Sequence, residues 1–428
     1  MRITKFETVR VGELPDIIWV RVHTDTGLIG LGESFYAATT IESAVHDHFG
    51  CMLVGRDPLA TERHWMDMFK LSDHAGYGGA EMRAISAIDM ALWDIKGQHA
   101  GVPIYELLGG GVRKKIRVYA TGGPYNGAGD LAKELVNDGI IAMKHGPSIA
   151  IATPTDGQLL HPKDLDIALK PIREIRDAVG NDIMIANDGH GKWALPQAIQ
   201  IAEAMEPFDI MWQEDLMPLM NPSSLLRLQE ATSAPICISE RLLSRWQFRE
   251  FIENGAARIV MPDLIWTGGI SEVYKIAVMA SVQQVPVAPH DATGPVNIFA
   301  CAQICMSIPN AMIMEHVRPF LNGWYSDFVE PNLPIEHGWL HAPQEPGIGT
   351  RLRKQVFERS DVTIKVTDKD VRVGLPDEDW ESVSDPFVTT PLNFDNSRNG
   401  RSEELEAEVY DIWRYRKQQI IESESDQL

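Results

Sequence analysis

The sequence lacks the features of several protein classes. It contains no apolar stretch long enough to cross a bilayer, which argues against an integral membrane protein. It has only 4 cysteines in 428 residues, and no two of them form a CxxC pair. Cys301 and Cys305 stand one helical turn apart in an apolar stretch, so we expect buried thiols that behave as small hydrophobes. The first ten residues alternate as a strand does and lack the apolar core of a signal peptide, so we expect a reducing, cytoplasmic location.

Basic residues are also scarce relative to acidic ones. Lys and Arg number 39 against 60 Asp and Glu, which gives a formal net charge of −21. Because binding to phosphates requires clustered positive charge, this balance argues against a nucleic-acid partner. Residues 361–428 hold 17 acidic and 8 basic residues, and we predict an acidic C-terminal extension there. An amphipathic helix is predicted within it, with one apolar face formed by Leu405, Val409, Ile412, Trp413 and Ile420.

Six polar residues recur along the middle of the chain, each just past a short apolar run. Successive members are 23 to 27 residues apart. Continuous apolar runs are typical of parallel strands covered on both faces, and a strand, a helix and two loops take roughly 25 residues. The repeat therefore predicts an α/β fold, a modified (β/α)8 TIM barrel that gathers the carboxyl ends of its strands on one face. The six residues are Asp188, Glu214, Glu240, Asp263, His290 and Glu315.

The chain is longer than one barrel of roughly 250 residues requires. Residues 1–115 begin with a strand meander and continue with helical periodicity, so we predict an α+β capping domain there. Residues 116–325 are predicted to form the barrel with the active site. Residues 326–360, with several Pro and Gly, are predicted to return onto the cap, and the acidic extension follows.

Asp188, Glu214 and Glu240 end three consecutive predicted strands. Carboxylates held at adjacent strand ends repel one another unless a cation neutralises them. A set of oxygen ligands without Cys or His selects a hard divalent ion, Mg2+ before Mn2+. Any one of these acids alone would be interpreted as a solvated loop residue, but three at nearly equal spacing predict a metal site.

Asp263 and His290 end the next two predicted strands. A neutral imidazole can accept a proton, and a carboxylate on its other nitrogen fixes the tautomer and stabilises the imidazolium that forms. His290 by itself would be interpreted as a surface histidine. Its position one βα unit beyond Asp263 instead predicts a His–Asp pair on the face that carries the three acids.

Four long stretches of the predicted barrel resemble one known family. They are Glu240-Arg-Leu-Leu-Ser-Arg-Trp-Gln-Phe, Met261-Pro-Asp-Leu, Gly268-Gly-Ile-Ser-Glu-Val-Tyr-Lys-Ile-Ala and Ala288-Pro-His-Asp-Ala-Thr-Gly-Pro. Over roughly residues 1–352 the chain resembles the enolase superfamily, in particular its mandelate racemase-like branch and the acid-sugar dehydratases of the galactonate dehydratase type. The resemblance implies that the three acids bind one Mg2+, with Mn2+ as a substitute, and that the His–Asp pair is the general base.

The resemblance also implies roles for residues on other strands. Glu315 is expected to hydrogen-bond the substrate carboxylate as it becomes an enediolate, as a protonated donor raised in pKa by burial, or else to pair with Arg241. His190, two residues beyond a metal ligand, is implied as the acid that protonates the departing 3-hydroxyl, or else only orients a substrate hydroxyl. Trp266 and Tyr36 are expected to line the pocket unless they are packed aromatics, and Arg241 is a further candidate substrate contact.

The second strand separates dehydratase from racemase. In the racemase pattern it supplies a Lys-x-Lys pair, whereas here it reads Lys144-His145-Gly146. Lys144 is expected to bind the substrate carboxylate. His145 could bind substrate or act as a base, but alternation along a strand points it away from Lys144. The missing second lysine disfavours a racemase that uses two bases.

These roles together predict a hydro-lyase. We expect Mg2+-dependent dehydration of a sugar acid, an aldonate of the galactonate, gluconate or mannonate type, to a 2-keto-3-deoxy acid. Two alternatives stay open: an isomerase (racemase, epimerase or cycloisomerase) that uses the same enediolate, and a non-catalytic binding protein on an inherited barrel. The expected partners are the small-molecule sugar acid and further copies of the chain, as a dimer or octamer.

Overall fold

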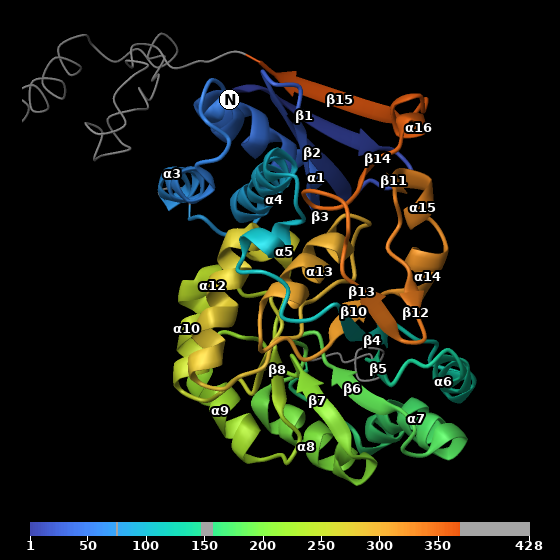
Figure 1. Cartoon of the computed structure of the whole chain (residues 1–428). Helices are drawn as coiled ribbons and strands as arrows, with labels where there is room; N and C mark the ends of the chain where they lie inside the picture. Colours follow the sequence, from blue (N-terminus) through green and yellow to red (C-terminus); the bar gives the residue numbers. More distant parts are fainter. Residues whose placement is uncertain (74–75, 147–156, 369–428) are drawn as a thin grey trace, which may run out of the picture. The chain divides into compact units, whose positions relative to one another are not determined.

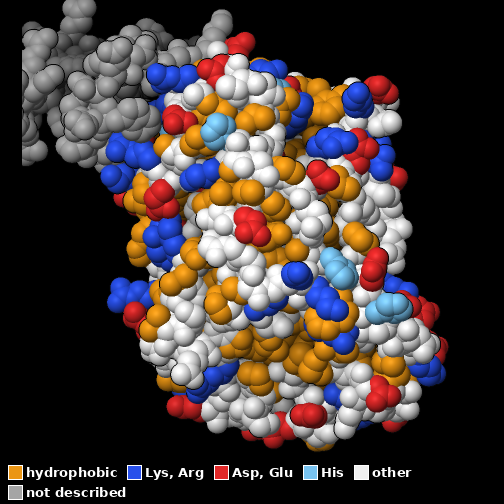
Figure 2. Space-filling view, in the orientation of Figure 1, with side chains coloured by type: hydrophobic (Ala, Val, Ile, Leu, Met, Phe, Trp, Pro, Cys, Tyr) orange, Lys and Arg blue, Asp and Glu red, His pale blue; other side chains and the backbone are white. Residues whose placement is uncertain are grey.

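The computed structural model describes residues 1–73, 76–146 and 157–368 (Figure 1). The amphipathic helix predicted in the acidic extension lies outside these residues. None of the helices described combines the length and the apolar character that a membrane span requires. On the face shown in Figure 2, basic side chains are interspersed with acidic ones.

An antiparallel sheet of four strands forms the core of the cap. β1 (Ile3–Val11), β2 (Ile17–Thr24) and β3 (Ile29–Phe35) follow one another as a meander, as the alternation of the sequence predicts. The outer edge of β1 pairs with β15 (Val362–Thr367), which gives the order β15-β1-β2-β3. β15 lies within residues 361–428, so the cap takes an edge strand from the start of the segment predicted as an extension.

A long helix, α4 (Ala80–Ala100), lies against β3 and is buried along most of its length. The close approach requires glycine on the strand. A Cβ atom at Gly30 would lie 2.0 Å from the carbonyl oxygen of Ala91, and one at Gly32 would lie 1.9 Å from that of Ala87. The remaining cap helices are α1 (Ala38–Ser43), the π-helix η1 (Ala44–Gly50), α2 (Cys51–Leu53), α3 (Thr61–Asp73) and α5 (Ile104–Leu107).

The barrel closes from parallel strands, as the repeat in the sequence predicts. The last strand pairs with the first, and the seventh position is held by the segment around Val287, which bridges Val260 on one side and Ala311 on the other. Helices cover the outside of the strands (Figure 1). The strands are β4 (Lys115–Thr121), β5 (Ala142–His145), β6 (Met184–Asp188), β7 (Ile210–Glu214), β8 (Ile236–Ile238), β9 (Ile259–Val260) and β10 (Met314–His316). The helices are α6 (Ala128–Asn137), α7 (Pro162–Val179), α8 (Leu195–Met205), η3 (Glu206–Phe208), α9 (Pro222–Glu230), α10 (Ser244–Glu253), α11 (Leu264–Thr267), α12 (Gly269–Val282) and α13 (Asn297–Ser307).

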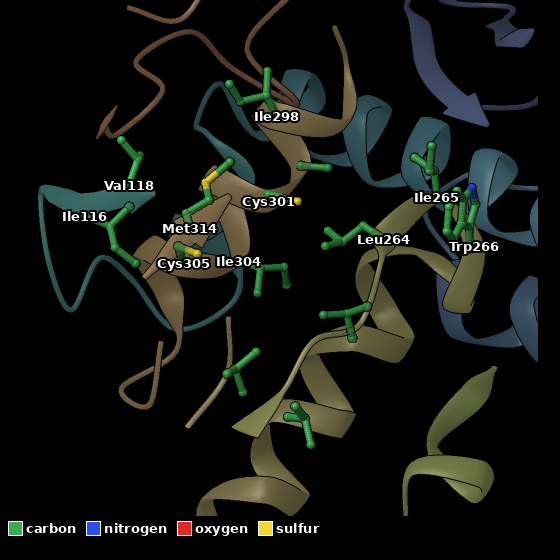
Figure 3. Close-up of a cluster of buried hydrophobic side chains, with 14 of the residues drawn as sticks. Ile116, Val118, Leu264, Ile265, Trp266, Ile298, Cys301, Ile304, Cys305 and Met314 are labelled. Carbon is green, nitrogen blue, oxygen red and sulfur yellow. The ribbon is translucent and has the colours of Figure 1, made fainter. Parts of the chain in front are cut away.

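Two apolar layers fill the barrel. The layer inside the strands contains at least one buried residue from each strand position, as a packed TIM-barrel interior requires. The layer between strands and helices includes Cys301 and Cys305 of α13 beside Met314 (Figure 3). Both thiols are buried and free, which confirms the prediction for them. The inner layer consists of Tyr119, Ala142, Ala186, Trp212, Cys237, Ile259, Met261, Ala288 and Ile313.

After β10 the chain runs back to the cap. The main-chain N–H of Ile348 donates to Asp94 of α4 at 2.8 Å. Cap and barrel also meet directly, because the buried Glu33 of β3 accepts from the main-chain N–H groups of Val296 and Asn297 at the start of α13. These contacts hold the cap over the carboxyl ends of the strands. The return contains α14 (Arg318–Asn322), α15 (Tyr325–Phe328), β11 (Val329–Glu330), β12 (Ile335–Glu336), β13 (Trp339–His341), β14 (Arg351–Leu352) and α16 (Lys354–Phe357).

Candidate active site

The three predicted metal ligands lie at neighbouring strand ends. Asp188 is the last residue of β6 and Glu214 the last of β7, and the two are direct partners in the parallel ladder. Glu240 follows two residues after the end of β8, the next strand. All three are buried, with exposures of 6%, 1% and 7%. The fold therefore brings them to one edge of the barrel.

Each of these carboxylates contacts a basic side chain. With the side chains placed in this way, no three His, Cys, Asp or Glu residues in the described ranges are gathered closely enough to hold a metal ion. A metal would have to replace some of these contacts. The pairs are Lys144 Nζ with Glu214 Oε1 at 2.7 Å, His190 Nε2 with Asp188 Oδ2 at 3.0 Å, and Arg241 Nη2 with Glu240 Oε1 at 3.3 Å.

The donor chemistry of the trio fits a hard divalent cation. Burial raises the pKa of Glu214 well above its ordinary value; Lys144 opposes this rise, whereas Asp188, Glu315 and Glu240 add to it. Like charges that are crowded in this way are stabilised by a cation, and carboxylate oxygens favour Mg2+ or Mn2+ over softer metals. Asp188, Glu214 and Glu240 are therefore the candidate ligands for such an ion, provided that their side chains turn from the basic groups that they now contact.

Asp263 and His290 form a hydrogen-bonded pair. His290 Nδ1 donates to Asp263 Oδ2 at 2.6 Å, and the backbones of the two residues are bridged as neighbouring parallel strands. Asp263 Oδ1 accepts from the main-chain N–H of Ile265 at 2.8 Å, so both carboxylate oxygens are fixed. This arrangement leaves Nε2 as the nitrogen of His290 that can exchange a proton with a substrate.

The surroundings of His290 favour its charged form. Burial acts to lower its pKa, but the carboxylates of Glu315, Asp263 and Glu240 outweigh burial and raise the pKa to about 10. A base must be neutral to accept a proton. A divalent cation on the Glu240 side of the site would offset part of this negative field and bring the pKa down toward neutrality.

Lys144 is the positive centre of the site. The end of β5 places its ammonium 2.8 Å from Glu315 Oε1 as well as beside Glu214, and these carboxylates outweigh burial and raise its pKa well above the ordinary value. It is therefore a cation and no base. His145 faces the other way, with Nε2 3.1 Å from the carbonyl oxygen of Pro124, as strand alternation predicts.

The charges around Glu315 favour its ionised form over the protonated form predicted from the sequence. Burial acts to raise its pKa, but Lys144 and His290 outweigh burial and lower the pKa below its ordinary value. Glu315 also accepts from the main-chain N–H of Asp291 at 2.9 Å. It is therefore a carboxylate that accepts hydrogen bonds, and it pairs with Lys144 rather than with Arg241.

His190 lies on the opposite side of the barrel from His290. Its own main-chain N–H donates to Asp188 Oδ1 at 2.9 Å, and its backbone adopts a left-handed conformation with φ of 50°. Such a conformation is uncommon outside glycine and marks a constrained position. The imidazole is about half exposed and lines a cavity of about 590 Å³ together with Arg241.

The two predicted aromatic contacts lie beside the dyad. The ring centroid of Trp266 is 5.3 Å from that of His290 and 5.7 Å from that of Tyr36. Trp266 is buried, whereas Tyr36 is 51% exposed and adopts φ of 63°. Trp266 is thus a packed aromatic that also forms a wall beside the proposed base.

Models of two known domains cover most of the chain. Residues 7–109 match the mandelate racemase/muconate lactonizing enzyme N-terminal domain, and residues 128–356 match the family described as enolase C-terminal domain-like. The chain belongs to the mandelate racemase/muconate lactonizing enzyme family of the enolase superfamily. The resemblance read from the sequence is thereby confirmed.

Relatives within this family are named for reactions on sugar acids. The chain is 34% identical to a D-galactonate dehydratase of Variovorax paradoxus, over 83% of this chain and 93% of that protein. It is 31% identical to a D-xylonate dehydratase of Haloferax volcanii, over 83% of this chain and 88% of that protein. An enolase of the mandelate racemase subgroup from Agrobacterium tumefaciens has a similar structure, with a TM-score of 0.82, 42% identity, and coverage of 86% of this chain and 99% of that one.

One residue of this family member's site escaped prediction from the sequence. Asp215, directly after Glu214, is 1% exposed and accepts from Arg241 Nη1 at 2.6 Å and from Ser239 Oγ. It orients the guanidinium that contacts Glu240. The two adjacent acids at the end of β7, Glu214 and Asp215, are the signal for this residue in the sequence. Because side chains alternate along a strand, the second acid points away from the first and contacts a different partner.

Proposed function

We propose that the protein catalyses Mg2+-dependent dehydration of a sugar acid to a 2-keto-3-deoxy acid. The observation that carries the proposal is the placement of a His–Asp dyad and a second histidine on opposite strands, with Lys144 among buried carboxylates between them. The relatives named as D-galactonate and D-xylonate dehydratases support the same reaction class, the dehydration of a sugar acid. Copies of this chain are proposed to associate as a dimer or octamer, a state that light scattering would measure.

Asp188, Glu214 and Glu240 would hold the Mg2+. When bound, the ion supplies positive charge that stabilises the substrate carboxylate as negative charge develops on it. Lys144 adds a second positive charge from the neighbouring strand, and Glu315 holds that ammonium in place at 2.8 Å. Positive charges fixed in this way before the reaction are an effective means of lowering the barrier to enediolate formation.

His290 is proposed to remove the proton from C2 of the substrate. Its Nε2 is the available nitrogen, because Nδ1 is hydrogen-bonded to Asp263. Asp263 stabilises the imidazolium that results and keeps the ring in the orientation needed for transfer. The electron pair released from the C2–H bond becomes part of the enediolate.

His190 is proposed to complete the elimination. The enediolate expels the 3-hydroxyl, which leaves as water after taking a proton from the imidazole of His190. The enol that remains tautomerises to the 2-keto-3-deoxy acid. Because the strands that carry His190 and His290 face each other across the barrel, base and acid act from opposite sides and an anti elimination is expected.

A substrate screen tests the proposed function. The protein with Mg2+ is incubated with a set of aldonic and aldaric acids, and 2-keto acids are detected as semicarbazones. At least one acid should give a 2-keto-3-deoxy product, and His290→Asn should abolish its formation. If no acid gives a 2-keto acid although the metal is shown to be bound, the proposal is overturned. Recovery of a C2 epimer instead of a keto acid would favour the isomerase.

A further inference from the structure

An arginine of the cap lies close to the dyad and has no role in the proposed reaction so far. Arg83 belongs to α4, and its Nη1 donates to the carbonyl oxygen of Phe35 at the end of β3 at 2.7 Å. Its Cζ atom lies 4.3 Å from the ring centroid of Trp266 and 5.9 Å from that of Tyr36. The guanidinium is thus stacked on the aromatic wall beside His290.

Unlike the other arginines near the site, Arg83 has no acidic partner among the residues that the structure describes. Arg241 pairs with Asp215 at 2.6 Å, and Arg245 pairs with Glu272 at 2.9 Å. For the guanidinium of Arg83, the described part of the chain provides one hydrogen bond, to a neutral carbonyl, and no ion pair. The remaining N–H donors of its planar fork are therefore available to a ligand.

The surroundings of Arg83 favour an anion. Burial lowers the pKa of its guanidinium, and the charge of Asp263 opposes that effect, which places the group in the field of the dyad. A partly buried guanidinium loses hydration, and a bidentate carboxylate is the partner whose geometry and charge restore it. A neutral hydroxyl would leave the charge uncompensated.

The position of Arg83 corresponds to the far end of a substrate. The C1 carboxylate is assigned to the region of Lys144, on the second strand of the barrel. Trp266, on which Arg83 stacks, follows β9, the sixth strand. In a barrel of eight strands the second and sixth positions face each other, so a chain of several carbons anchored at Lys144 extends toward Arg83.

We propose that Arg83 binds a second carboxylate at the far end of the sugar acid, so that the preferred substrate is a dicarboxylic sugar acid of the aldaric class. This inference rests on the proposed function for the placement of the C1 carboxylate. It identifies Arg83 as a residue that determines specificity rather than a participant in proton transfer.

A matched pair of acids tests this proposal by equilibrium binding. Galactarate and galactonate differ only at C6, which is a carboxylate in the first and a hydroxymethyl group in the second. Calorimetry in the presence of Mg2+ would measure both dissociation constants for His290→Asn, which cannot turn the acids over. We expect galactarate to bind at least tenfold more tightly, and an added Arg83→Gln to remove this preference, a change of about 10- to 100-fold in the ratio. Arg83→Lys should retain part of it, because charge remains without the fork.

The ratio within one preparation is insensitive to partial unfolding, so a smaller folded fraction in the Arg83 variant does not imitate the result. Arg245→Gln is the control, because Arg245 also stacks on tryptophan, with Cζ 5.4 Å from the Trp65 ring centroid, but is paired with Glu272. It should leave the ratio unchanged. A preference for galactonate, or a ratio that Arg83→Gln leaves intact, would overturn the proposal even if the unmutated enzyme dehydrates galactonate. Binding of galactarate that depends on Arg83, without turnover of any acid, would support the site while the proposed function failed.

Discussion

Replacement of His190 by asparagine should separate the two halves of the proposed reaction. The backbone at His190 has φ of 50°, a left-handed conformation that asparagine tolerates better than most residues. The variant should therefore keep the local fold. It also keeps a polar side chain beside Asp188 but provides no comparable acid for the departing hydroxyl.

The expected magnitude follows from the contacts of His190. Loss of a general acid typically costs about 10²–10⁴-fold in rate, which corresponds to about 3–5 kcal/mol of barrier. In the variant, Asp188 loses its contact with His190 Nε2 at 3.0 Å. In the parent the pKa of Asp188 is lowered to about 2 although burial opposes this, and the loss of His190 should raise it. Lys144 remains among the groups that lower this pKa, so the predicted metal binding of Asp188 should persist, and the metal content of the variant checks this.

The assay is carried out in D2O. Deuterium at C2 of the recovered substrate, measured by mass spectrometry, reports on proton removal by His290, and the semicarbazone reports on the keto acid. His190→Asn should exchange the C2 proton at close to the parent rate while keto-acid formation collapses. His290→Asn should lose both signals.

Two results would refute this division of labour. In the first, His190→Asn forms keto acid at nearly the parent rate, which would leave His190 only the role of orienting a hydroxyl. In the second, His190→Asn loses exchange as completely as His290→Asn while the metal is still bound. Metal content of each variant, measured by atomic emission, separates the second result from simple loss of the ion.

Three further predictions concern the metal, the number of bases and the pH dependence of stability. Chelation should abolish turnover, and added Mg2+ should restore it. Glu214→Gln should lose most activity, because it removes the charge of a ligand while keeping its shape. A chelated enzyme that remains active would contradict the metal site. Exchange of the C2 proton should proceed without inversion of configuration, because Lys144 is held charged and His145 is bound to the Pro124 carbonyl oxygen. Chromatography would measure the C2 epimer, and an epimer formed as fast as exchange would reveal a second base. Burial lowers the pKa of His46 and His64 to about 4, so between about pH 6.5 and 4 the unfolded chain binds protons at these two residues that the folded chain does not, and their contribution to the free energy of unfolding falls with pH. Glu33, Asp89 and Asp94 act in the opposite direction, because burial raises their pKa to about 7. The measurement is therefore the difference between variants: His64→Gln should lose less stability, or gain more, than the parent between pH 7 and pH 5 in urea unfolding, and an identical pH dependence in the two proteins would show the reasoning to be wrong.

The barrel could be predicted from the sequence because its strands are covered on both faces. Such strands are short continuous apolar runs, and one βα unit fixes the distance from one strand end to the next. The resulting period placed Asp188 and Glu214 at the ends of β6 and β7, where the structure has them. The same pattern could not reveal β15, because its Val362, Ile364 and Val366 alternate with polar residues, whereas the barrel strands are continuous apolar runs.

Charge states in the site could not be predicted because they depend on contacts between distant strands. Glu315 follows an apolar run, and burial alone suggested a raised pKa. The direction is instead set by Lys144 and His290; Lys144 is 171 positions earlier in the chain, on β5, and its ammonium reaches Glu315 past the intervening strand β4. The position of Arg83 beside Trp266 could not be predicted for a related reason. The sequence of α4 indicates a buried cap helix, and only the packing of that helix against β3 brings this one side chain to Trp266.

The balance of charge links the metal site to the base. Carboxylates raise the pKa of His290 to about 10, although burial opposes this rise, and in that state the imidazole is protonated and cannot accept a proton from C2. Lys144 cannot correct this, because it is already paired with Glu214 and Glu315. A divalent cation held by the trio would add positive charge on the side of Glu240, which is one of the groups that raise the pKa. In the proposed reaction the metal site would therefore also lower the pKa of His290 toward the range of a competent base, and loss of the metal should impair C2 exchange as well as elimination.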